Sequence, residues 1–199
     1  MTPSPAPQQT TGRRAAQQEE RAARIRLAAR ALLAEDGPRG LTIRAVAERA
    51  GYVAGSVYSY FPSKEALLAA LVVDEMDGLV QALRTAPADL DSRADLALDT
   101  LRDQVPLLMA ARRGDVPEAT ERALTGRIIA VLRALDAARG DHDDPAGTPP
   151  SDRAYDTVAL WSGLVGIALL SGCGRFASLD LEENRVLASL LGRFGGASS

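Results

Sequence analysis

Residues 41–64 constrain this chain more than any other stretch, because their capping and turn residues allow few backbone arrangements. Thr42 precedes apolar residues at helical spacing and therefore predicts a helix start, since its side chain can accept from free backbone N–H groups. Gly51 predicts the end of that helix, because a residue without Cβ enters the left-handed conformation at little cost. A second short helix is predicted for residues 54–60, and Pro62 prevents its continuation. This order is typical of a helix-turn-helix, whose second helix enters the DNA major groove.

The same stretch resembles the DNA-binding domain of the TetR family of transcriptional regulators. The matching features are Thr42, the helix ending Ala50-Gly51, Gly55-Ser56-Val57-Tyr58 and Tyr60-Phe61-Pro62-Ser63-Lys64. The chain departs from the family at Val53, where a small polar residue is usual, and at Ala54, where lysine or a polar residue is frequent. The resemblance implies an all-α protein with an N-terminal three-helix helix-turn-helix domain. A connecting helix would join that domain to a C-terminal helical bundle for ligand binding and dimerisation.

The resemblance also implies which residues meet double-stranded DNA. Phosphate contacts are expected from Thr42, Tyr58, Tyr60 and Lys64. Base readout is expected from Arg44 and from the short second helix, chiefly Gly55 and Ser56, with help from Tyr52 or Ala54. A bidentate arginine–guanine contact contributes roughly 1–3 kcal/mol of discrimination between bases. Phe61 is expected in the core of the domain.

Composition and charge agree with this interpretation. Aromatic residues make up only 4% of the chain and alternation of β-branched residues is nearly absent, which favours helices. The formal net charge is −3, yet residues 1–70 hold ten basic and six acidic side chains, a net +4, and the remainder holds thirteen and twenty, a net −7. Basic residues therefore gather beside the helix-turn-helix, as phosphate neutralisation requires. Taken alone, the same charges are equally compatible with a solvated helix face.

Three ranges are predicted along the chain. Residues 1–14, rich in Pro, Thr and Gln, form a disordered arm, which either reaches the minor groove through Arg13 and Arg14 or only adds solubility. Residues 15–62 form the DNA-binding domain, with a first helix ending before Asp36-Gly37-Pro38. Residues 63–199 hold the connecting helix, over about residues 64–85, and the ligand-binding and dimerisation domain. In that domain Pro106 is expected to bend or divide a helix over residues 88–113.

The resemblance places a small-molecule effector between helices of the second domain and pairs its last two long helices with a second copy. The small residues Gly163, Gly166 and Ala168 would permit close approach in that homodimer. The run 161–166 weakly resembles a Trp-His-Gly subtype of the family, without its histidine. Few polar residues lie on the apolar stripes, which favours an apolar or weakly polar effector; each candidate lining residue is also compatible with ordinary core. These candidates are Leu108, Met109, Leu124, Ile128, Trp161, Leu164 and Val165.

Catalytic constellations are missing from the sequence. His142 is the only histidine, and its acidic loop offers the one candidate for metal-dependent catalysis; a solvated loop is the simpler interpretation. Cys173 is the single cysteine, which excludes an intrachain disulfide and fits a reducing cytoplasm; a buried thiol is expected, with redox sensing as the alternative. No enzyme activity, cofactor, metal or membrane partner is expected.

We therefore expect a ligand-responsive, homodimeric cytoplasmic repressor that binds a palindromic operator. The alternative is a helical small-molecule or partner-binding protein without specific operator recognition, which the unusual pair at positions 53 and 54 would favour.

Overall fold

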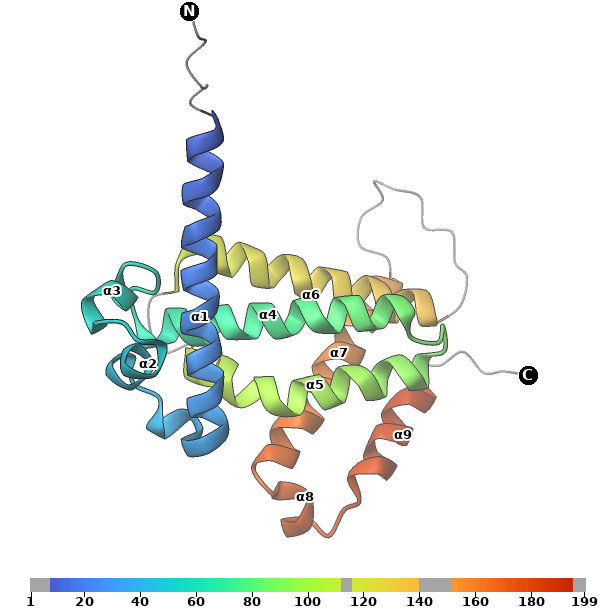
Figure 1. The fold of residues 1–199 in the computed structure, drawn as a ribbon. Helices are drawn as coiled ribbons and strands as arrows, with labels where there is room; N and C mark the ends of the chain where they lie inside the picture. Colours follow the sequence, from blue (N-terminus) through green and yellow to red (C-terminus); the bar gives the residue numbers. More distant parts are fainter. Residues whose placement is uncertain (1–7, 112–115, 140–151, 195–199) are drawn as a thin grey trace, which may run out of the picture.

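The structure is a computed structural model that describes residues 8–111, 116–139 and 152–194. Within these ranges the chain forms nine helices and no strand, which confirms the all-α class (Figure 1). The helices are α1 (Gln8–Gly40), α2 (Ile43–Ala50), α3 (Ala54–Tyr58), α4 (Lys64–Thr85), α5 (Leu90–Ala111), α6 (Glu118–Ala138), α7 (Asp152–Gly172), α8 (Arg175–Ser178) and α9 (Glu183–Phe194).

Helix α1 corrects the expectation of a disordered arm over residues 1–14. It begins at Gln8 instead of Ala15, so residues 8–14 are helical, and its amino end projects beyond the body of the protein (Figure 1). After Pro7 no proline interrupts the chain until Pro38, and extending a helix costs far less than nucleating one. The predicted stop does interrupt the helix geometry, because Gly37 has φ 66° and ψ −174°. Residues 1–7 lie outside the described part of the chain.

The N-terminal core joins α1, α2 and α3 to the start of α4. Predicted stripe residues of α1, such as Ile25 and Ala29, are fully buried there, and Phe61 is buried as expected. Helix α3 ends at Tyr58, two residues before the predicted end at Tyr60. Its last carbonyl groups are met by the turn that follows, where Phe61 N donates to Val57 O at 2.9 Å.

Helix α4 belongs to both cores, and this fixes the boundary between the two parts. Leu67, Leu68 and Leu71 pack in the N-terminal core, whereas Val72 and Met76 pack in the second core. The first two turns of the connecting helix are therefore part of the DNA-binding domain rather than a spacer after it.

The second core is a bundle of α4, α5, α6, α7 and α9, in which α4, α5 and α6 run side by side (Figure 1). Helix α5 runs as one helix past position 106, so the expected division there is absent. A short helix, α8, separates α7 from α9 and was not predicted. Cys173 is exposed, which contradicts the expected buried thiol, because α7 ends at Gly172 and the chain turns at Gly174, whose φ is 63°.

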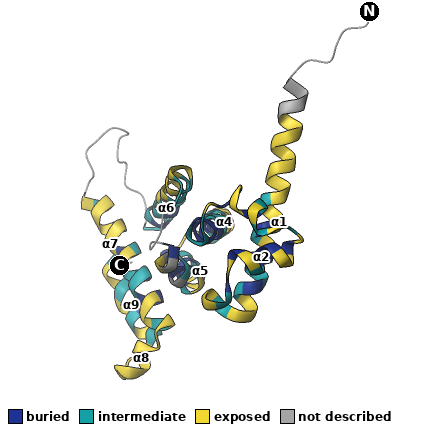
Figure 2. Ribbon diagram, turned by 90° about the vertical axis from the view of Figure 1, so that its left-hand side faces the viewer, coloured by how far each residue is buried: buried dark blue, intermediate teal, exposed yellow. Residues whose placement is uncertain are grey.

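Helix α7 is long and apolar enough, by length and composition alone, to cross a membrane. One side of it belongs to the bundle, since Leu160, Leu164 and Ile167 are buried in the second core. These contacts make α7 a core helix of the bundle. Its opposite side remains exposed, and apolar residues such as Tyr155 and Val158 lie there (Figure 2).

Candidate nucleic-acid interface

The turn between α2 and α3 has the geometry that the sequence predicts. Thr42 Oγ1 accepts from Ala45 N at 3.1 Å and caps α2. Gly51 lies in the left-handed region at φ 74° and ψ 34°, and Tyr52 N donates to Ala47 O at 2.8 Å. This turn reverses the chain within three residues and presents α3 beside α2, at the edge of the body (Figure 1).

The outer surface of α3 is open. Gly55 is exposed, and a Cβ built there would meet no atom within 4 Å, so the fold itself does not require glycine at this position. Tyr58 is 52% exposed, and Val53, the residue before α3, is 73% exposed and offers no side-chain cap. Ala54 and Ser56 are half-buried. A surface of this kind allows close approach of a groove, and Val53 adds an apolar group of the sort that contacts a thymine methyl.

The two candidate contacts on α2 differ in what they leave free. Thr42 is exposed and uses its hydroxyl oxygen as the cap, so its O–H remains able to donate to a phosphate. Arg44 is exposed one turn into the helix and forms no ion pair with any described residue. Arg49, on the same helix, is held by Glu35 through two hydrogen bonds of 2.6 Å. The hydrogen bond from Arg49 lowers the pKa of Glu35 below its ordinary value.

Tyr52 and Tyr60 face α1 rather than open space. Arg24 lies 5.2 Å from the ring centroid of Tyr52 and donates to Ala50 O at 3.4 Å. The Tyr60 hydroxyl accepts a hydrogen bond from Arg21, which raises the pKa of that guanidinium. Both tyrosines are half-buried against the N-terminal core. These α1 arginines were not among the predicted site residues, and only the basic excess of residues 1–70 pointed to them.

Lys64 lies at the first position of α4, where Ser63 Oγ accepts from Ala66 N at 3.0 Å. Its ammonium donates to Pro38 O at 2.8 Å. Because an ammonium has three donors, this contact leaves two for a phosphate at the positive end of the helix. Lys64 therefore connects the end of α1 to the expected DNA-facing surface.

Four of the predicted effector-binding residues meet in the second core: Leu164 is buried, and Leu124, Trp161 and Val165 pack against it. Ile128 is half-buried on α6, and Met109 is 52% exposed at the end of α5. The side chain of Leu108 lies outside the described residues, as does His142. Within the described ranges no group of three or more His, Cys, Asp or Glu residues is arranged to hold a metal ion.

An exposed short helix fixed by a glycine turn, with cations and hydroxyl groups around it, defines a helix-turn-helix DNA-binding protein. The family described as bacterial regulatory proteins, tetR family, matches residues 25–71. The HTH-type transcriptional regulator Rv1816 of Mycobacterium tuberculosis is 33% identical over 88% of this chain and 90% of its own length. This chain belongs to the TetR family of transcriptional regulators.

Other relatives agree with that assignment. The HTH-type transcriptional repressor KstR2 of Rhodococcus jostii is 41% identical over 33% of this chain and 32% of its own length. A TetR transcriptional regulator from Rhodococcus sp. RHA1 has a TM-score of 0.66 at 23% identity, covering 92% of this chain and all of the other. The regulator RolR, solved with resorcinol, has a TM-score of 0.57 at 22% identity, covering 92% of each chain. At such identities the two solved structures establish a shared fold.

Proposed function

We propose that this TetR-family regulator is a homodimeric repressor in the cytoplasm, which binds a palindromic operator and is released by a small, mainly apolar effector. The observation that carries the proposal is the sharing of α4 between the two cores. Because Leu71 and Val72 are adjacent residues in different cores, a rearrangement of the bundle moves the helix-turn-helix through a rigid element.

Operator contact is proposed for the residues around α2 and α3. Thr42, Tyr58 and Lys64 would bind phosphates, and Arg44 with the open face at Gly55 would read bases. The half-buried Tyr52 and Tyr60 would act mainly by fixing α3 against α1, since Arg24 and Arg21 contact them. Two subunits would then read half-sites about one helical turn apart or more.

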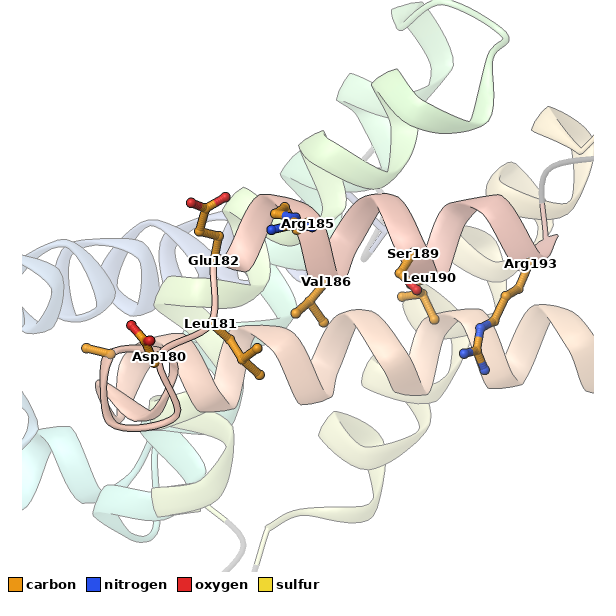
Figure 3. A pocket seen from close by; sticks show the side chains of 9 residues that line it. Asp180, Leu181, Glu182, Arg185, Val186, Ser189, Leu190 and Arg193 are labelled. Carbon is orange, nitrogen blue, oxygen red and sulfur yellow. The ribbon is translucent and has the colours of Figure 1, made fainter.

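The homodimer is proposed to form through α7 and α9. Exposed apolar residues on α7 and on the segments around α8 support this, and isolated soluble chains rarely leave large contiguous apolar patches uncovered. A groove along α8 and α9 adds Leu181, Val186 and Leu190 between charged residues (Figure 3). The exposed set on α7 and near α8 comprises Tyr155, Val158, Leu169, Leu170, Leu179 and Leu181.

Two of the glycines of α7 have different tasks in this arrangement. A Cβ at Gly163 would come within 2.7 Å of Leu190 side-chain atoms, so its small size serves the packing of α7 on α9 within one chain. A Cβ at Gly166 would meet nothing within 4 Å. Gly166 is therefore the better candidate for close approach of the second copy.

Repression and release are proposed by analogy with relatives. KstR2 is named a transcriptional repressor, and RolR was solved with resorcinol as its ligand. The residues Leu124, Trp161, Leu164 and Val165, which the bundle brings together, stay candidates for effector contact.

The test is selection of bound duplexes from a random pool by the full-length protein, with the variant Tyr58→Ala/Lys64→Ala as a control. Enrichment of a palindrome by the wild-type protein alone is expected. Sedimentation of a Val158→Asp/Leu169→Asp variant tests the dimer, because both positions are exposed in the single chain and a monomer is expected. A dimer that survives both charges would refute the proposed interface.

A second function is favoured by the exposure of Val53 and the missing cap at α3: a helical small-molecule or partner-binding protein without specific operator recognition. Under that hypothesis, binding to all duplexes is equally weak. A sequence preference whose affinity falls steeply with salt excludes it.

A further inference from the structure

A cavity of about 400 Å³ lies where the two parts of the protein meet. The carboxyl half of α1 lies across the start of α4 and the end of α5, and the cavity is enclosed among these three helices (Figure 1). Its size falls within the range of about 300–1,000 Å³ that ligand pockets occupy. None of the seven effector-contact candidates from the sequence lines it. The lining residues are Arg30, Leu33, Ala34, Pro38, Leu71, Glu75, Arg102, Asp103, Gln104 and Leu107.

Gln104 gives this cavity an unmet polar requirement. Its side chain is only 8% exposed, and its Oε1 atom is buried without a hydrogen-bond partner among the described residues. Burying an amide oxygen without a donor is unfavourable, and native proteins rarely leave one unpaired. Because Gln104 lines the cavity, a molecule held there can supply the missing donor.

The rest of the lining defines what such a molecule looks like. Two cations and two carboxylates contribute, so their formal charges cancel and no ion is selected. Arg30 is engaged by Glu75 at 3.0 Å, and Arg102 is engaged by Glu183 at 3.1 Å, so both guanidinium groups already have partners. The remaining lining is mainly aliphatic, from residues of all three helices. An uncharged molecule with an apolar body and one hydroxyl or amide donor fits this chemistry.

We propose that the α1–α4–α5 cavity binds an uncharged effector of this kind, with its donor on Gln104 Oε1, and that occupancy lowers operator affinity. The inference deepens the proposed effector response and rests on it for the regulatory step. It assigns the binding site to the junction of the two parts, apart from the bundle residues that the sequence singled out.

Contacts between α1 and α4 explain how occupancy reaches DNA. Arg26 Nε binds Asp74 at 2.8 Å, Arg30 binds the same carboxylate at 3.1 Å, and Lys64 donates to Pro38 O at 2.8 Å. Pro38 lines the cavity and is bonded to a predicted phosphate contact at the same time. A ligand wedged between α1 and α5 displaces this segment, and with it Lys64 and the core on which α2 and α3 rest.

The experiment is calorimetric titration of the full-length protein with para-tert-butylphenol and with para-tert-butylanisole, which has the same body without the O–H donor. The wild-type protein is expected to bind the phenol roughly tenfold more tightly, about the value of one hydrogen bond to a buried acceptor. In Gln104→Leu that preference is lost. Ala34→Phe, at an exposed helix position on the cavity wall, fills the space and weakens both probes.

Three outcomes overturn the cavity assignment: neither probe binds, both bind Ala34→Phe as tightly as the wild-type protein, or Gln104→Leu keeps the preference for the phenol. A crystal structure of the mixture in which only an ordered water occupies Gln104 Oε1 does the same. Release is measured separately, as loss of operator affinity with saturating phenol in the wild-type protein but not in Ala34→Phe. Binding without release overturns the regulatory step, whereas a protein that selects no operator refutes the proposed function and leaves the calorimetric result standing.

Discussion

Two arginines on the same short helix allow a matched test of DNA recognition. Arg44 is exposed and forms no ion pair with the described residues, so no internal contact must break before it reaches a base. Arg49 is already held by both oxygens of Glu35 at 2.6 Å. We expect Arg44→Ala to weaken operator binding by about 1–3 kcal/mol, the value of a bidentate base contact, which is roughly 5- to 150-fold in Kd. Arg49→Ala is expected to change it far less.

The assay is fluorescence anisotropy with the selected operator and with duplexes carrying single base-pair changes, at several salt concentrations. If Arg44 reads a base, its removal abolishes discrimination at one position in each half-site. If it binds only phosphate, affinity falls equally for all duplexes and the salt slope decreases by about one. A loss for Arg49→Ala equal to that for Arg44→Ala would refute the reasoning, because a preformed ion pair would then not protect an arginine from use.

Three further predictions concern stability. Gly51→Ala should cost about 1–2 kcal/mol in urea unfolding, because an alanine is strained at φ 74°, and Gly51→Asn should cost less; equal values would contradict the backbone argument. Gly163→Ala should cost about 1 kcal/mol, the low end for overpacking, since the Leu190 atoms that it meets end a half-buried side chain; Gly166→Ala, which meets nothing, is the control, and a stable Gly163→Ala would contradict the packing. Burial opposes ionisation of Glu183, yet hydrogen bonds from Arg102 and Ser171 outweigh it and lower its pKa, so its stabilising effect is present above pH 4.5 and is lost as the pH falls through the lowered pKa. Unfolding curves of the wild-type protein and Glu183→Gln should therefore converge in acid, and a constant difference would disprove this.

Local signals predicted the DNA-binding half well. The Thr42 cap, the Gly51 turn, the Ser63 cap and the bounds of α4 depend on residues within one or two turns of each other, and all appear as predicted. Less local features failed. The amino end of α1 was assigned to disorder from its composition, and Cys173 was placed in the core from its apolar neighbours, whereas the chain turns outward there.

The sequence by itself determined the helical class, the helix-turn-helix and the likeness to one family, because caps, glycine turns and helical spacing are short-range and carry their own physical cause. The tertiary structure decided which side chains remain available. It alone shows that Arg49 is already paired while Arg44 is not, and that Lys64 reaches back to Pro38. The cavity beside Gln104 likewise exists only where α1, α4 and α5 meet, since its walls come from residues up to 77 positions apart, Arg30 to Leu107, whose proximity no local pattern encodes.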